Sequence, residues 1–130
     1  MEINSGERLT AKRGSADYFA GEVWLEPLVQ SGSTDLQMVR VTFSPGARTA
    51  WHTHPGGQIL YISSGRGLVQ KLGEPVLEMR VGDTVIIAAG EKHWHGARPD
   101  CPMQHLAIQP LVGGVGADWM EQVSDADYAG

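Results

Sequence analysis

Several features that would indicate an exported, membrane-bound or nucleic-acid-binding protein are missing from this sequence. Cys101 is the only cysteine, so no disulfide can form within the chain, and the polar start Met1–Glu7 has no apolar secretion signal. The longest wholly apolar run, Val85–Ala89, is far shorter than the roughly 20 residues of a membrane-spanning helix. The formal net charge of −5 offers no attraction to nucleic-acid phosphates or anionic lipids. We therefore expect a cytoplasmic protein that contacts neither nucleic acid nor membrane.

Histidine is also scarce, but its placement is the most informative feature of the chain. Four of the 5 histidines form two pairs, His52 with His54 and His93 with His95, each separated by one residue. Because side chains alternate between the faces of a β-strand, both members of a pair point the same way. His105 lies in another strand-like run and faces the same cavity only if that strand keeps the right phase. Neutral imidazole is a common ligand of divalent transition metals, so the pattern predicts a metal site.

The rest of the chain has the pattern of an all-β protein, in which short β-branched and aromatic runs alternate with glycine and proline turns. This spacing indicates a sandwich or barrel, and 130 residues suit a single domain over 1–130. We place a turn at Ser63–Gly67 and a short helix at Asp118–Val123, which begins with a capping residue. The expected strands are Val23–Leu25, Leu36–Phe43, the His52 segment, Gln58–Ile62, Leu68–Leu72, Val76–Arg80, Thr84–Ile87 and Met103–Gln109.

Two stretches, at 46–65 and 82–97, resemble the paired motifs of the cupin family. The first has the family's spacing through Gly46, His52, His54, Gln58 and Gly65, with glutamine where the family has glutamate. The second has it through Gly82, Gly90 and His93, with Ala88 in place of the usual proline and Ala97 in place of the usual asparagine. The resemblance covers about 36–109. It implies a double-stranded β-helix, or jelly-roll barrel, that holds a metal inside.

By that resemblance, the ligand positions of the family fall on His52, His54, Gln58 and His93. Three neutral imidazoles and a neutral amide leave the charge of a divalent ion uncompensated, which favours Lewis-acid chemistry over cycles that need a trivalent ion. The amide of Gln58 is a weak ligand, and it can instead hydrogen-bond a metal-bound water. The donor set is compatible with manganese, iron, nickel, zinc or copper. The resemblance favours manganese.

The segments 45–55 and 90–97 are similar to those of small bacterial cupins that include manganese-dependent hydroxynitrile lyases. This narrower resemblance implies a lyase that converts cyanohydrins to aldehyde plus hydrogen cyanide and back. His95 and His105 would then carry protons. For His95, direct coordination, a proton-carrying role beside the ion and plain packing all remain open, and we favour the second.

Three further residues are candidates for the substrate space, namely Val39, Val41 and Gln109, provided that their strands keep regular alternation. Val39 and Val41 fit a core role equally well. An apolar wall with one amide suits an aromatic or aliphatic aldehyde. A metal-dependent oxygenase and a non-catalytic small-molecule-binding cupin are the alternative functions.

Trp51 and Trp94 alternate with the cavity-facing histidines, so strand geometry sends both indoles to the opposite side of the sheet. Either the N-terminal segment around Tyr18–Trp24 covers them, or a second subunit does, since aromatic residues are enriched at interfaces. We expect the second arrangement, as a homodimer or homotetramer. Cys101 lies between prolines and is expected to be a turn residue without a catalytic role.

Overall fold

The computed structural model describes residues 1–29 and 32–130, which form a curled antiparallel β-structure, as the sequence predicts. Within these residues, no helix combines the length and apolarity needed to cross a membrane. The elements are η1 (Gly6–Arg8), β1 (Lys12–Arg13), β2 (Phe19–Ala20), β3 (Val23–Pro27), β4 (Leu36–Phe43), β5 (Arg48–Thr49), β6 (His52–Thr53), β7 (Gln58–Lys71), β8 (Leu77–Arg80), β9 (Thr84–Ile87), β10 (His93–Ala97), β11 (Met103–Pro110), β12 (Asp118–Trp119) and α1 (Asp125–Ala129).

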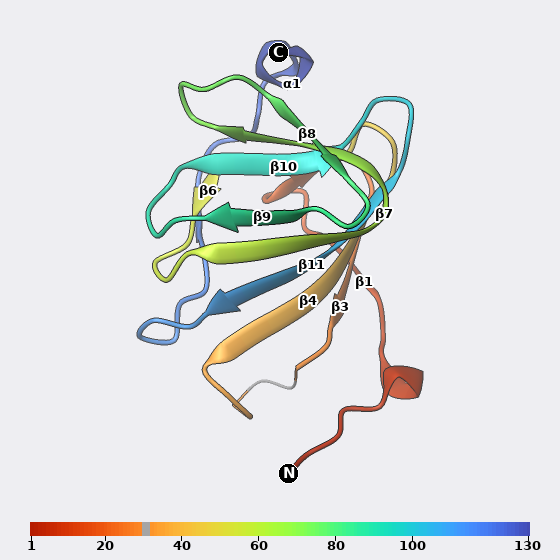
Figure 1. The fold of residues 1–130 in the computed structure, drawn as a ribbon, viewed down its shortest axis with the longest axis vertical. Coiled ribbons are helices and arrows are strands. Elements are labelled where there is room, and N and C mark those ends of the chain that lie inside the picture. Colours follow the sequence, from red (N-terminus) through yellow and green to blue (C-terminus); the bar gives the residue numbers. More distant parts are fainter. Residues whose placement is uncertain (30–31) are drawn as a thin grey trace.

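The strands form two sheets that share β7. In the first sheet, β1, β3, β4, β11, β7 and β9 pair in that order. In the second sheet, β10 pairs with β7, β5 and β6, while β2, β8 and β12 extend the edges. Figure 1 shows β7 curving from one sheet into the other. The predicted jelly-roll architecture is confirmed, and its concave interior receives alternate side chains of both sheets.

The expected turn at Ser63–Gly67 is wrong, because these residues lie inside the continuous strand β7. Gly65 has φ +72°, and a Cβ placed there would lie 1.9 Å from the carbonyl oxygen of Pro102. Only glycine combines this backbone conformation with so close an approach. The glycine-rich sequence therefore bends the strand instead of ending it, and the bend carries the chain from the first sheet to the second.

The expected helix at Asp118–Val123 is also misplaced. Asp118 and Trp119 form β12, in which Trp119 pairs with His52 of β6. The Trp119 ring packs against the His52 ring with the centroids 4.5 Å apart. This long-range packing outweighs the local capping preference of an aspartate, which is a weak determinant. The short C-terminal helix instead begins after Ser124, whose side chain caps it.

Residues 1–29 and 32–130 bury two apolar clusters. The larger one fills the barrel on the side of the bend in β7 and includes Phe43, Leu60, Ile62 and Met103. The smaller one lies outside the barrel, where Trp51, Trp94 and Val123 pack with Leu68, Val76 and Tyr128.

The second cluster corrects the prediction made for the two tryptophans. Trp51 and Trp94 do lie on the outer side of the second sheet, with 4% and 0% exposure, but the C-terminal segment of the same chain covers them. Tyr128 of α1 packs on Trp94 with a centroid separation of 5.6 Å, and its hydroxyl donates to the carbonyl of Ala97. Neither the N-terminal segment nor a subunit interface is needed for this purpose. The two tryptophans therefore no longer support the expected homodimer or homotetramer, which stays a prediction.

Candidate metal centre

Three buried imidazoles are held in the same tautomer by backbone carbonyl oxygens. A carbonyl only accepts hydrogen bonds, so the contacting Nδ1 carries the hydrogen and leaves the lone pair on Nε2. Such fixing of the ring by an outer partner is typical of metal-ligating histidine. The Nδ1 atoms donate to these oxygens: His52 to Ala50 at 2.9 Å, His54 to Gly116 at 2.7 Å and His93 to Glu91 at 2.8 Å.

The strands bring these rings together. His52 of β6 and His93 of β10 are directly paired, with ring centroids 4.2 Å apart. The ring of His54 lies 4.9 Å from that of His52 and 5.3 Å from that of His93. His95 joins the same group, because one nitrogen from each of His52, His93 and His95 lies within 4.8 Å of the others. Direct coordination by His95, the less favoured sequence interpretation, is therefore geometrically accessible.

Burial keeps these rings neutral. It is the largest cause of the lowered pKa of His52, well below its ordinary value, and of the pKa of His93, which falls to about 4. The neighbouring imidazoles lower both further, because two adjacent imidazolium ions repel each other. A neutral imidazole with a free Nε2 is the form that binds a metal.

The buried imidazole nitrogens give a second reason why the site fits a cation. The Nε2 atoms of His54 and His95 are buried and find no hydrogen-bond partner among the residues that the structure describes. A buried polar atom without a partner costs about 1–3 kcal/mol. A divalent ion between the rings would satisfy the lone pair of His54, and the lone pair of His95 would be satisfied either by the ion or by a substrate hydroxyl. His52, His93 and His95, whose ligand nitrogens lie within 4.8 Å of one another, can therefore hold a metal, as cupins do.

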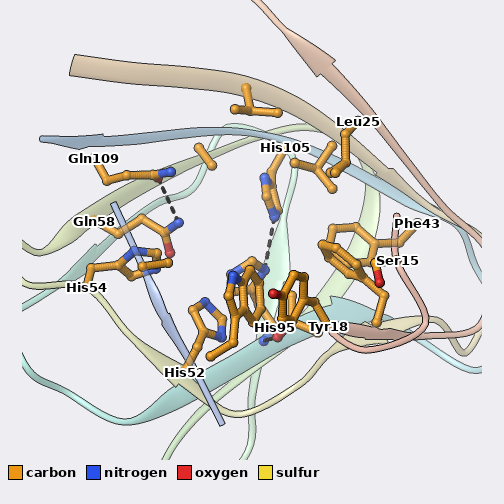
Figure 2. A pocket seen from close by; sticks show the side chains of 17 residues that line it. Ser15, Tyr18, Leu25, Phe43, His52, His54, Gln58, His95, His105 and Gln109 are labelled. Atoms are coloured by element: carbon orange, nitrogen blue, oxygen red, sulfur yellow. Dashed lines mark hydrogen bonds between the residues drawn. The ribbon is translucent and has the colours of Figure 1, made fainter. Parts of the chain in front are cut away.

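Gln58 lies at the start of β7 beside these histidines, and each polar atom of its amide has a polar neighbour. Its Nε2 donates to Oε1 of Gln109 at 3.1 Å, and its Oε1 lies 3.4 Å from Nε2 of His93. Figure 2 shows the Gln58 and Gln109 side chains meeting on the cavity wall. The amide oxygen, which is the only good ligand atom of glutamine, thus faces the histidine group.

His52, His54 and His95 open onto a cavity of about 390 Å3. The expected substrate-facing residues Val39, Val41 and Gln109 all line it, and so does His105. The phase of β11, on which the placement of His105 and Gln109 depended, is regular: its residues alternate between buried and half-buried from Met103 to Pro110. The one register shift between β11 and β7 falls at Gln104–His105 and leaves the inward set intact.

His95 and His105 form a hydrogen-bonded pair deep in this cavity. Nε2 of His105 lies 3.0 Å from Nδ1 of His95, and their exposure is 0% and 4% respectively. Burial lowers the pKa of His105 to about 3 and that of His95 well below its ordinary value, so both rings are neutral at pH 7. The pair can share or pass one proton, which is the arrangement of a general base with a supporting partner.

Sequence reasoning missed the aromatic residues that shape the cavity. Tyr18, Phe19 and Trp119 line it, and Tyr18 stacks on Trp119 with the ring centroids 4.8 Å apart. Their convergence depends on two pairings that are remote in sequence, β2 with β5 and β12 with β6, which local patterns do not reveal.

The fold and the site together define a small jelly-roll protein with a histidine-lined cavity. The cupin domain family model matches residues 39–109, which is more than half of the chain. The chain therefore belongs to the cupin family, as its paired motifs suggest.

Individual relatives extend the match beyond the family domain. A protein of Granulicella tundricola named (R)-mandelonitrile lyase is 48% identical over 129 residues, which cover 98% of each chain. Among solved structures, a cupin-like protein of Thermotoga maritima is 42% identical with a TM-score of 0.85, over 89% of each chain. A protein of the same organism described as a predicted oxalate decarboxylase is 25% identical with a TM-score of 0.74, over 86% of this chain and 100% of the other. The lyase name of the first relative supports an enzymatic role.

Proposed function

We propose that this protein is a metal-dependent lyase that cleaves a cyanohydrin to an aldehyde and hydrogen cyanide, and forms it in the reverse direction. The observation that carries the proposal is the buried cavity in which neutral histidines face an apolar wall. The near full-length similarity to a protein named (R)-mandelonitrile lyase supports the substrate class. No charged side chain lines the cavity among the described residues, which suits a neutral substrate.

His52, His54, Gln58 and His93 would hold the ion, and manganese is our preferred metal. A divalent ion held there would supply Lewis acidity, which lowers the pKa of a nearby hydroxyl. The protein would keep the four ligand side chains uncharged and fixed in orientation, so that none of the ion's positive charge is cancelled. The carbonyl partners of the imidazoles and the Gln109 partner of Gln58 perform this fixing.

His95 is the proposed proton acceptor. Its Nδ1 faces His105, so its Nε2 is the atom free to receive the hydroxyl proton of the substrate. The carbon–carbon bond then breaks, the electron pair leaves with the nitrile as cyanide, and the same proton can return to cyanide to give hydrogen cyanide. His105 stabilises the transient imidazolium by accepting a hydrogen bond from Nδ1 of His95.

The cavity walls position the rest of the substrate. Val39 and Val41 of β4 and the Trp119 ring supply apolar contact, while Gln109 supplies an amide within the same space. An aromatic aldehyde presents a flat apolar surface and one oxygen, which matches this distribution.

The test combines metal analysis with an activity assay on the purified protein. We expect benzaldehyde release from mandelonitrile that is lost on chelation and restored by Mn2+. His95→Ala should lower turnover by about 10²–10⁴-fold, the usual contribution of a general base. Gln104→Ala, on the same strand β11 as His105 but half-buried outside the cavity, is the matched control and should retain turnover.

Two results would refute the proposal. Turnover that survives complete metal removal would exclude the Lewis-acid role, and absence of cleavage in the fully loaded protein would exclude the substrate class. Substrate-dependent oxygen consumption would indicate the oxygenase alternative. Ligand binding with neither activity would indicate a non-catalytic cupin.

A further inference from the structure

Three glutamines form a row across the inner face of the first sheet. Gln37 on β4 is the direct cross-strand partner of Gln109 on β11. Gln58 begins β7 on the other side of β11, next to the paired residues Ile59 and Ile108. Directly paired side chains on one face of a sheet are in contact range. The three amides therefore lie side by side on adjacent strands and end at the histidine group.

Their hydrogen bonds run in one direction. Nε2 of Gln58 donates to Oε1 of Gln109 at 3.1 Å, and Nε2 of Gln109 donates to Oε1 of Gln37 at 3.1 Å. Gln58 and Gln109 thus each direct the amide nitrogen toward Gln37 and the amide oxygen toward the histidines, and Gln37 accepts at the end of the row. Amide dipoles aligned head to tail reinforce one another, so the direction of the row is a property of all three residues.

The direction matters because glutamine coordinates a cation only through oxygen. A half-turn of the terminal amide would present NH2 to the cavity, and that group has no acceptor lone pair. This terminal torsion is broad and has no strong preference of its own. The hydrogen-bond row is what selects the orientation in which Gln58 offers oxygen.

Gly116 contacts both the glutamine row and one histidine of the proposed metal centre. A Cβ on Gly116 would lie 2.1 Å from Oε1 of Gln37, so the exposed Gln37 amide would have to shift if residue 116 carried a side chain. The carbonyl oxygen of the same residue accepts the hydrogen bond from Nδ1 of His54. One loop residue thus seats the far end of the amide row and fixes one imidazole.

We propose that Gln37 is a positioning residue which, through Gln109, holds the amide oxygen of Gln58 toward the metal centre. It touches neither the histidines nor the substrate in this role. The inference rests on the proposed part of Gln58 as a ligand and is independent of whether the protein cleaves cyanohydrins.

The first experiment measures Mn2+ affinity from the electron paramagnetic resonance signal of the free aqueous ion. Gln37→Met removes the acceptor at similar size and unchanged charge, and it should weaken binding by about 10-fold, the scale of an outer partner of a metal ligand. Gln37→Glu keeps an acceptor and should bind at least as tightly as the unaltered protein. Gln104→Met on β11 is the matched control, because it loses an amide away from the cavity and should leave affinity unchanged.

A double-variant comparison separates positioning from a general structural effect. In Gln58→Glu the ligand has two equivalent oxygens, so its orientation no longer depends on the row. Adding Gln37→Met to that variant should then change Mn2+ affinity by less than 2-fold. An equal loss in both backgrounds would overturn the proposal.

A second readout needs no metal. In the nuclear magnetic resonance spectrum of the metal-free protein, the side-chain NH2 signals of Gln58 should shift in Gln37→Met, although Gln109 lies between the two residues. Unchanged Gln58 signals would overturn the proposal even where Mn2+ affinity falls. Failure of the cyanohydrin assay leaves both readouts untouched, so the two proposals fail separately.

Discussion

Acid should destabilise the metal-free protein well above the pH at which carboxylates titrate. Burial holds the pKa of His93 at about 4 and that of His105 at about 3, whereas an imidazole in the unfolded chain has a pKa near 6.5. Between these limits the unfolded state binds more protons than the folded state. The free energy of unfolding therefore falls as the pH falls, and the loss begins near pH 6.5.

The size of this effect follows from the two values. Between pH 7 and pH 5 the unfolded chain takes up nearly one proton at each position while the folded protein takes up almost none, which costs about 2 kcal/mol per histidine. The two residues together should lower the free energy of unfolding by about 4 kcal/mol. This is a large part of the roughly 5–15 kcal/mol that stabilises a typical domain.

Urea unfolding of the chelator-treated protein at pH 7, 6 and 5 measures the effect. His105→Gln removes one titrating ring, so its loss between pH 7 and 5 should be about 2 kcal/mol smaller than in the unaltered protein. Comparing slopes within each variant cancels any constant destabilisation caused by the substitution itself. A free energy of unfolding that stays level from pH 7 to pH 5 would show that these rings are not buried in the neutral form.

Two further predictions concern the fold that holds the site. Gly65→Ala should destabilise the protein by several kcal/mol, because it adds a clash with the Pro102 carbonyl to the cost of a positive φ. Gly73→Ala, with φ +83° and open space around its Cβ, carries only the conformational cost of about 1–2 kcal/mol, and thermal unfolding giving equal losses for the two variants would contradict the close packing. Tyr128→Phe removes the hydrogen bond to the carbonyl of Ala97 and should cost about 0.5–1.5 kcal/mol in urea unfolding, whereas an unchanged midpoint would show that the bond adds nothing to the C-terminal cover.

The histidine spacing was sufficient to predict the cavity-facing set because it depends on strand alternation alone. His52 and His54, like His93 and His95, need no knowledge of distant contacts to be placed on one face. The jelly roll was predictable for a similar reason, since the paired motifs combine local turns with these positions. The cupin family match confirms that part of the analysis.

The errors arose where distant contacts decide the local structure. Nothing near Gly65 in the sequence distinguishes a bend from a turn; the carbonyl of Pro102, brought close by β11, decides it. Trp119 likewise follows a good helix cap but pairs with His52 across the barrel. The covering of Trp51 by the C-terminal segment could not be predicted either, because it depends on contacts between residues that are distant in the sequence. The expected oligomer, cytoplasmic location and metal identity stay predictions.

The bend in β7 has a mechanical consequence for the two walls of the cavity. One uninterrupted strand carries Gln58 at its first residue and, further along, Val69, the cross-strand partner of His95. The wall that carries Gln58 and the wall that carries His95 are thus joined by covalent backbone as well as by hydrogen bonds. The separation of the two walls therefore depends on the bend at Gly65, and a substitution that changes this bend should move Gln58 relative to His95.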